Sequence, residues 1–267
     1  MADLNKYILN AEREKGFIKE VVNNVEQETK VLTDDLAEVL HTDSNASYQF
    51  PVLDESKDIT VSTVSEMGVI PVSNLGLKSV TVPMKRYSTI VVISKESLKW
   101  ENIALENEIK KGMARGLAKA LNKDYIALVT GDGVKEVTGT SDLTNDISDA
   151  MTQLETIGRE TTRVILPTTR KGEIRKLIQS QTDSLINLES AFNTPITFMS
   201  EMGANKGICV DKSQIKLILG GVEIDVLEEG SVVDGETTIN LGQQYAVAFR
   251  CNLYACLTQF NPQARIK

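Results

Sequence analysis

The sequence predicts an α+β fold, and three observations carry this prediction. The spacing of apolar residues changes from helical to strand-like after a polar segment at 41–50. A helical pattern then runs from Glu101 to Leu128, and strand-like runs follow one another from Ile196 to Phe260. The chain has 267 residues, of which 41% are hydrophobic, so it can build a core in one large domain or two small ones.

The first expected element is a charged, helix-prone segment from Leu4 to about Leu40. Its apolar residues recur as Phe17, Ile18, Val21, Val22 and Val25, and again as Leu32, Leu36, Val39 and Leu40. This spacing predicts an amphipathic helix that is broken near Gly16. An amphipathic helix cannot bury its apolar face by itself. We therefore expect the segment to lie on the rest of the subunit or on a neighbouring one.

The second expected element is a long two-stranded excursion that begins at Pro51, after the turn-rich residues 41–50. Short apolar runs between Ile59 and Val82 are separated by Gly68, Pro71 and Gly76. The excursion has too few apolar residues to be a domain, and an isolated hairpin is only marginally stable in water. Contacts outside its own subunit are therefore expected to stabilise it.

The run from Tyr87 to Leu98 predicts a β-rich strand followed by a helix-start signal, Ser-Lys-Glu-Ser, at 94–97, and a long helical pattern then covers Glu101 to Leu128. On this helix Leu105, Ile109, Met113, Leu117 and Leu121 recur every four residues, with Gly112, Gly116 and Ala120 beside them. The small residues would let another backbone approach closely. The residues TGDG at 130–133 end the helix and predict a tight turn with positive φ, since the ligands that would flank a phosphate or metal loop are missing.

The remaining elements predict an α+β or α/β layer that forms a lobe of its own. A helix at 143–157, a strand at 162–167 and a helix at 170–179 come first, and strand-like runs follow at 196–199, 207–210, 215–219 and 222–227. After an acidic loop, a long strand pattern covers 244–260. This strand can return to pair with the strand before the long helix, closing a second lobe from discontinuous segments.

Charge and cysteine content exclude several classes of protein. The net charge of -8 argues against a general nucleic-acid binder, so any contact with DNA should be weak or local. An N-terminal signal peptide is not indicated, and no run of about 18 uncharged apolar residues could span a membrane. Cys209, Cys251 and Cys256 are odd in number and form no CxxC pair, which favours buried reduced thiols and a cytosolic folding environment.

No catalytic, cofactor-binding or metal site is predicted, and no cofactor. The single histidine, His41, lies in the polar segment, and the sequence has no G-x-S-x-G, P-loop, Rossmann, EF-hand or HExxH motif. The acidic groups Glu12, Glu14 and Glu20, and Asp34, Asp35 and Glu38, are typical of the solvated face of a charged helix. We therefore predict that the protein is not an enzyme. A soluble, oligomeric α/β enzyme with a concave site remains an alternative reading.

The order of these parts resembles the major capsid proteins of tailed double-stranded DNA bacteriophages, which share the Hong Kong 97 fold. Two stretches carry the resemblance, VSEMGVIPVSNLGLKSVTVPMKRYSTIVVISKESL and ENEIKKGMARGLAKALNKDYIALVTGDG. They are similar to the family's extended loop with its return strand and to its long spine helix. The stretch ISDAMTQLETIGRETTRVILPTTRKGEIRKL is similar to the first helix, strand and helix of the family's axial lobe.

The resemblance covers nearly the whole chain and implies four parts. They are an N-terminal arm at 1–48, an extended β-hairpin loop at 49–90, a peripheral domain at 91–140 and 244–267 with a spine helix at about 101–128, and an axial domain at 141–243. It implies a shell protein of the virion, assembled in the host cytoplasm. The implied partners are further copies of the chain in pentamers and hexamers, a portal, decoration proteins, and double-stranded DNA enclosed without sequence-specific binding; no membrane is involved.

The sequence departs from some members of that family in two respects. No long scaffolding extension precedes the arm in this sequence, so we expect the scaffold to be either a separate protein or a segment already removed, and the initial Met1 favours the former. Some members also join subunits through a Lys of the extended loop and an Asn of the peripheral domain. Lys57, Lys78, Asn252 and Asn261 occupy those regions, but no motif selects a pair, so no cross-link is predicted. An encapsulin, a shell of the same fold that encloses a cargo enzyme, is the second interpretation.

Overall fold

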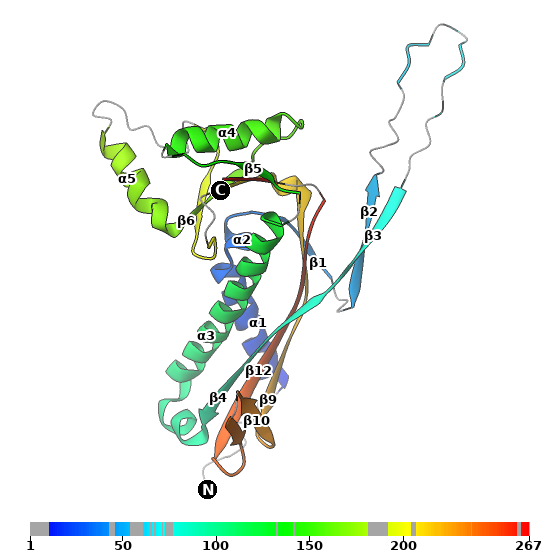
Figure 1. Cartoon of the computed structure of the whole chain (residues 1–267). Coiled ribbons are helices and arrows are strands. Elements are labelled where there is room, and N and C mark those ends of the chain that lie inside the picture. Colours follow the sequence, from blue (N-terminus) through cyan, green and yellow to red (C-terminus); the bar gives the residue numbers. More distant parts are fainter. Residues whose placement is uncertain are drawn as a thin grey trace.

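The computed structural model confirms the α+β fold (Figure 1). It describes residues 11–42, 46–53, 61–64, 66, 68–70, 72, 77–131, 133–140, 142–180, 192–203, 207–235, 237–260 and 263–266. Two larger sheets and two hairpins account for the strands of these residues. The longest helix, α3 (Lys95–Val129), lies along one side of the first sheet.

The first sheet has four strands in the order β1-β9-β12-β4. Their bounds are β1 Glu38–His41, β9 Ile215–Leu227, β12 Ala246–Gln259 and β4 Lys85–Ser94. β12 is antiparallel to both β9 and β4, while β1 is parallel to β9. The long C-terminal strand therefore does pair with the strand before the long helix, as the sequence allowed. β9 is a single strand, because its pairing with β12 continues through the two expected runs with one register shift between Leu253 and Ala255.

Helix α3 begins at Lys95, within the start signal predicted at 94–97 and before the helical pattern that starts at Glu101, because Ser94 caps it. The Ser94 hydroxyl accepts a hydrogen bond from the backbone N–H of Ser97 at 3.1 Å. The predicted apolar row is buried against the sheet, and Met113 and Leu121 are among its least exposed members. A helix of this length spans about 50 Å. It ends in the expected turn, in which Gly133 has a φ of 81°.

The two glycines of α3 lie on its exposed face, and nothing lies within 4 Å of a Cβ added to Gly112 or Gly116. The close approach of another backbone that these residues predicted is therefore absent among the described residues of the subunit. Glycine in a helix interior is less favourable than alanine by about 0.5–1 kcal/mol. These two glycines therefore lower the stability of the helix, although no packing contact among the described residues of the subunit requires them.

Replacing both glycines by alanine is expected to stabilise the unassembled subunit by about 1–2 kcal/mol, because the added methyl groups meet no neighbour. Urea unfolding of the Gly112→Ala/Gly116→Ala variant would measure this difference. If the variant is no more stable than the parent, the added methyl groups must meet a neighbouring group in the folded subunit, and the explanation is wrong.

The N-terminal segment differs from its predicted course in two ways. Helix α1 (Ala11–Glu28) runs without a break through Gly16, and the break lies instead at Thr29, before the short helix α2 (Lys30–Thr33). Thr29 is fully buried, and its hydroxyl donates to the carbonyl of Val25 at 2.6 Å. The predicted helix up to Leu40 is wrong, because the chain reverses at Asp35 (φ 52°) and enters β1.

The second sheet has five strands in the order β5-β13-β8-β6-β7. Their bounds are β5 Lys135–Val137, β13 Ala264–Ile266, β8 Gly207–Val210, β6 Arg163–Pro167 and β7 Ile196–Met199. Helix α4 (Leu143–Glu155) packs a row of buried aliphatic side chains on this sheet. Helix α5 (Lys171–Ser180) follows β6 through a short 3-10 turn, Thr168–Arg170.

Three strands belong to a different sheet from the one that the sequence predicts. β9, which falls in the segment 141–243, belongs to the four-stranded sheet. β5 and β13, which were assigned to the lobe with the long helix, belong to the five-stranded sheet instead. The cause is strand pairing, since β9 matches β12 over its length and β13 lies between β5 and β8. Each lobe is therefore more discontinuous in sequence than expected.

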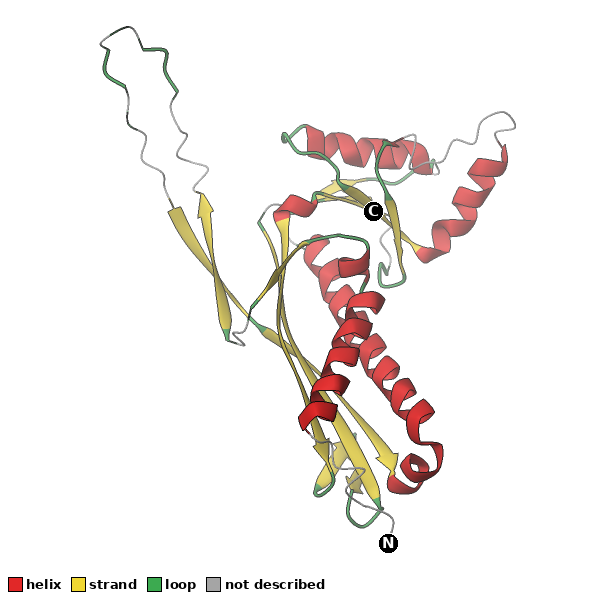
Figure 2. Ribbon diagram, turned by 180° about the vertical axis from the view of Figure 1, so that it is seen from behind, coloured by secondary structure: helices red, strands yellow, loops and turns green. Residues whose placement is uncertain are grey.

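Two hairpins extend from the four-stranded sheet. The acidic segment expected to be a loop forms β10 (Ser231–Asp234) and β11 (Thr237–Asn240), turned at Gly235 with a φ of 59°. The predicted two-stranded excursion is present as β2 (Ser47–Leu53) paired antiparallel with β3 (Leu77–Pro83). This second hairpin projects away from the body of the molecule, on the side opposite to α3, in both views (Figures 1 and 2).

Candidate assembly interfaces

The base of the projecting hairpin is fixed to the four-stranded sheet by aromatic packing. Phe50 of β2 is only 6% exposed and packs with Ile218 and Cys256 on the sheet. Its ring lies edge-to-face with Phe260, with ring centroids 5.4 Å apart, and it also contacts Tyr48. Edge-to-face pairs of this kind add to the energy of burial. The direction in which the hairpin leaves the body is therefore set by its own subunit.

The distal part of the hairpin loop is apolar and exposed. Four aliphatic side chains there are between 74% and 92% exposed, namely Val61, Val69, Ile70 and Val72. Burying an aliphatic side chain of this size is worth about 1.5–3 kcal/mol. Soluble monomers rarely present a group of apolar side chains in this way, and such groups mark interaction surfaces. The distal loop, 61–72, is the first candidate interface.

The second candidate lies between α1 and α3, which pack side by side. Val21 and Val25 of α1 are buried in the main core, so the helix is bound to its own subunit. Ion pairs also join the two helices, from Lys110 Nζ to Glu20 at 2.5 Å and from Arg115 Nε to Glu28 at 3.3 Å. This placement confirms that the amphipathic helix lies on the rest of the subunit.

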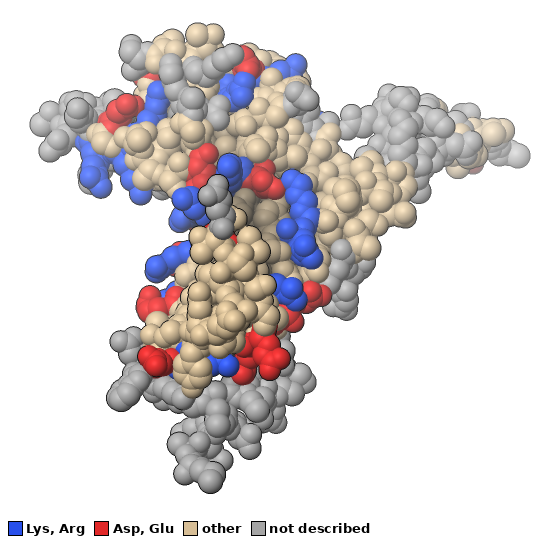
Figure 3. Space-filling view, turned by 60° about the horizontal axis from the view of Figure 1, so that its bottom comes forward, with Lys and Arg blue, Asp and Glu red and all other residues tan. Residues whose placement is uncertain are grey.

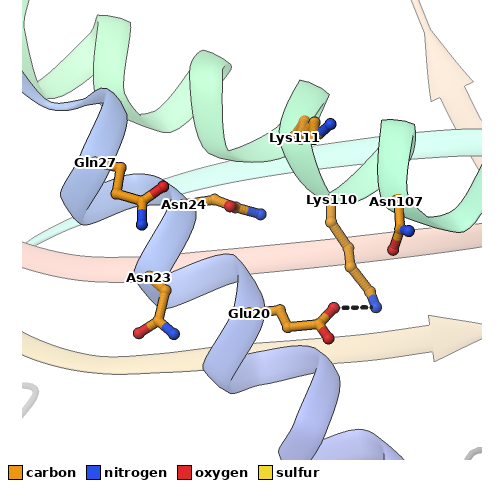
Figure 4. A pocket seen from close by; sticks show the side chains of 7 residues that line it. All are labelled: Glu20, Asn23, Asn24, Gln27, Asn107, Lys110 and Lys111. Atoms are coloured by element: carbon orange, nitrogen blue, oxygen red, sulfur yellow. Dashed lines mark hydrogen bonds and ion pairs between the residues drawn. The ribbon is translucent and has the colours of Figure 1, made fainter.

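A polar groove of about 300 Å³ opens between these helices (Figure 4). It is lined by Glu20, Asn23, Asn24, Gln27, Asn107, Lys110 and Lys111. Carboxamide groups predominate, and each offers both a hydrogen-bond donor and an acceptor. The groove therefore suits a polar surface that carries both kinds of group, and nothing in its residues resembles a catalytic pair.

Strand β4 is joined to α3 by a hydrogen-bonded carboxylate. Lys85 Nζ donates to Asp124 Oδ2 at 2.9 Å, and the Tyr87 hydroxyl donates to the same oxygen at 2.8 Å. Burial opposes ionisation of Asp124, but the hydrogen bonds from Lys85 and Tyr87 outweigh it and lower the pKa of the carboxyl group below its usual 3.8. Burial, aided by the hydrogen bond to Asp124, raises the pKa of Tyr87.

The Asp124→Asn variant is expected to unfold at a lower urea concentration, with a loss of about 1 kcal/mol at neutral pH, since the carboxylate is one-third exposed. Because the folded-state pKa is lowered, this stabilisation is present above the ordinary pKa of 3.8 and is lost as the pH falls through the lower folded value. Urea unfolding at neutral and acid pH would measure the difference, with Asp149→Asn, an exposed carboxylate, as control. Equal losses in both variants would contradict this role.

The described residues that were candidates for catalysis are exposed or form separate ion pairs, and they do not come together as a catalytic group. His41 ends β1 and is exposed. Three of the candidate carboxylates, Asp34, Asp35 and Glu38, pair separately with Lys30, Lys212 and Lys216, and Glu20 pairs with Lys110. The side chains of Glu12 and Glu14 lie outside the described part of the chain.

The three cysteines are buried and unpaired, as predicted. Burial raises the pKa of Cys209 to about 12 and that of Cys251 to about 11, so neither thiol ionises appreciably near neutral pH. Within the described residues, no group of three or more His, Cys, Asp or Glu side chains could hold a metal ion. No helix in the described part of the chain is long and apolar enough to cross a membrane.

The residues considered for a covalent cross-link are only partly described. Lys57 and Asn261 lie outside the described residues, and of Lys78 the structure describes the backbone in β3 alone. Asn252 is 6% exposed, and its side-chain oxygen accepts a hydrogen bond from Ser88 at 2.7 Å. Its side chain is therefore engaged within the subunit.

Sequence reasoning did not anticipate the carboxamide groove or the Asp124 link. The groove residues come from helices about 90 positions apart, so only the packing of α1 on α3 brings them together. On the face seen in Figure 3, basic and acidic side chains lie interspersed.

A family model described as the phage capsid family matches residues 14–209 of the chain. Solved structures of similar fold include one from Mycobacterium phage Adephagia, with 14% identity, a TM-score of 0.65, and coverage of 90% of this chain and 89% of that one. One from Microbacterium phage Oxtober96 has 15% identity, a TM-score of 0.68 and coverage of 87% and 89%. A virus-like particle from Pyrococcus furiosus has 14% identity, a TM-score of 0.63 and coverage of 96% and 100%. No curated protein matches the sequence.

Proposed function

The chain belongs to the phage capsid family, and from this premise we propose that it builds the icosahedral head shell that encloses the DNA of a tailed bacteriophage. The shell would consist of many copies in rings of five and six. The observation that carries this proposal is the projecting hairpin, whose base is fixed while its distal aliphatic side chains remain exposed. We also infer that the chain catalyses no reaction, since it belongs to a family of structural proteins.

The hairpin supports a head-to-tail contact between neighbouring copies. Its base is fixed on its own body, so its distal loop projects away from that body and would be received by a different patch on the adjacent copy. Contacts between different patches are heterologous, and they close into rings when the rotation between copies allows it. The distal loop would lie over the adjacent subunit and bury there the side chains of Val61, Val69, Ile70 and Val72.

The amphipathic helix α1 supports a second contact, at its N-terminal end. The helix is held against the main core by Val21 and Val25. The arm would reach beneath a different neighbour, with the carboxamide groove beside it as a polar contact surface. A scaffolding protein, a portal and decoration proteins are further proposed partners during assembly in the host cytoplasm.

The parts of the subunit would then have distinct tasks. The arm (1–48) and extended loop (49–90) would join neighbours, the lobe around α3 would form the rigid body of the shell, and the lobe with the five-stranded sheet would crowd around the ring centres. DNA would be held by enclosure rather than by sequence-specific binding. The net charge of -8 supports a lumen that does not grip the genome over its whole surface.

Negative-stain electron microscopy of the chain expressed alone tests this proposal, with and without nuclease treatment and with mass analysis of whatever co-purifies. We expect closed shells or rings that hold no specific enzyme. Shells filled with one host enzyme would instead support a cargo-enclosing compartment. A uniform dimer or tetramer would show that the chain does not form a shell.

A further inference from the structure

We propose that the exposed face of α3 contacts the phosphate backbone of packaged DNA through a stripe of four cations. The stripe consists of Lys111, Arg115, Lys119 and Lys123, and is called the α3 basic stripe below. This proposal rests on the proposed shell function, since it concerns the molecule that the shell encloses. It adds a defined contact to a subunit whose overall charge is acidic.

The geometry of the stripe follows from the helix. Its four residues are spaced four positions apart, and all four are exposed, whereas the row formed by Met113, Leu117 and Leu121 is buried against the sheet. At about 1.5 Å per residue, successive cations are about 6 Å apart and the stripe is about 18 Å long. Along that length a DNA duplex presents about five phosphates per strand. The stripe can therefore meet several phosphates at once.

The local charge of this segment is opposite to that of the chain. Residues 109–123 contain five Lys and Arg residues and no Asp or Glu, in a chain with a net charge of -8. One of the five, Lys110, is buried and pairs with Glu20, so it lies apart from the stripe. The remaining four give one side of α3 a positive potential that a polyanion would match along its length.

The acidic groups nearest the α3 basic stripe leave its cations able to bind phosphates. Glu108 lies 3.6 Å from Lys111 and Glu28 lies 3.3 Å from Arg115, and both pairs are solvent-exposed, so each contributes little and can yield to a phosphate. Lys119 has no ion-pair partner in the part of the chain that the structure describes. Asp124, beside Lys123, is already bound by Lys85 and Tyr87.

The surface beside the α3 basic stripe carries no bulky side chain at two positions, because both are glycines. Gly112 and Gly116 are exposed on the same face, with open space around them. No side chain at these two positions therefore stands between a phosphate backbone and the neighbouring cations. Contacts of Lys and Arg with phosphates do not distinguish one base from another, so the binding would be independent of the DNA sequence.

The test compares the Lys119→Gln/Lys123→Gln variant with a matched control, Lys135→Gln/Arg175→Gln. Both variants remove two exposed cations, and the control pair lies on β5 and α5, away from α3. Binding of a fluorescent duplex of about 30 base pairs to the full-length, unassembled chain is measured by anisotropy over a range of salt concentrations. Shell formation by each variant is followed in parallel by electron microscopy.

We expect the stripe variant to bind the duplex at least about tenfold more weakly near 0.1 M salt, and the slope of log affinity against log salt to fall by about 2. The control should keep the parent slope. Equal slopes in both variants would overturn the proposal. Loss of shells with unchanged DNA binding would also overturn it, because the stripe would then contact protein. If the parent itself forms no shells, the proposed function fails, while the slopes still decide whether the stripe binds DNA.

Discussion

Replacing residues 54–76 by an Asn-Gly turn is expected to abolish closed shells while the subunit stays folded. Leu53 and Leu77 pair directly across the β2–β3 hairpin, so a two-residue turn can join them without changing the register. The replacement removes Val61, Val69, Ile70 and Val72, whose burial on a neighbour would be worth about 1.5–3 kcal/mol each. Sedimentation velocity, together with circular dichroism for folding, would measure the effect.

A control variant that keeps the loop length distinguishes the effect of shortening the loop from the effect of losing its apolar contacts. In this variant the four aliphatic residues are changed to serine and the rest of the loop is retained. We expect it to form few shells, and those less stable than the parent's. If the shortened variant still forms closed particles of normal stability, the distal loop is not needed for assembly and the proposed contact is wrong.

The Phe50→Ala variant is expected to release the base of the hairpin from the sheet. Phe50 packs with Ile218, Cys256 and Phe260, so its truncation should cost about 3–5 kcal/mol locally. The main core does not contain Phe50 and should remain folded. A hairpin that no longer leaves the body at a set angle must lose conformational entropy on binding a neighbour, so shell formation should fall sharply.

The matched control for this variant is Thr81→Ala. Thr81 lies in the same strand pair but on the exposed face of the hairpin, opposite Gln49. Hydrogen exchange of the hairpin amides would report the loosening directly, and particle yield would report its consequence. Parent-like shell yield in Phe50→Ala, alongside loosened amides, would show that assembly does not depend on the anchored base.

Local pattern alone predicted the elements with a strong period. The four-residue recurrence through Met113 and Leu121 identifies α3, because one face of a long helix is buried along its whole length. The apolar run 244–260 identifies β12 for a similar reason, since both of its neighbours are strands. The start signal at 94–97 also identifies where α3 begins, because the Ser94 hydroxyl caps its first turn.

Pairing between distant segments limited the rest of the prediction. Val39 and Leu40 fit a helical stripe as well as a strand, and only parallel pairing with β9 decides between the two. The sheet that β9 joins is set by its match to β12, which no short window of sequence contains. The Asp124 link joins residues 37 and 39 positions apart, so it becomes visible only in the folded chain.

A cryo-electron microscopy reconstruction of the particles formed by the chain would show whether the hairpin joins neighbouring copies in a closed shell. We expect a closed shell in which every subunit lays its β2–β3 hairpin over an adjacent copy, with Val61, Val69, Ile70 and Val72 buried there. A closed shell in which these side chains stay exposed to solvent would contradict the proposed contact. A small oligomer with no closed surface would contradict the shell function itself.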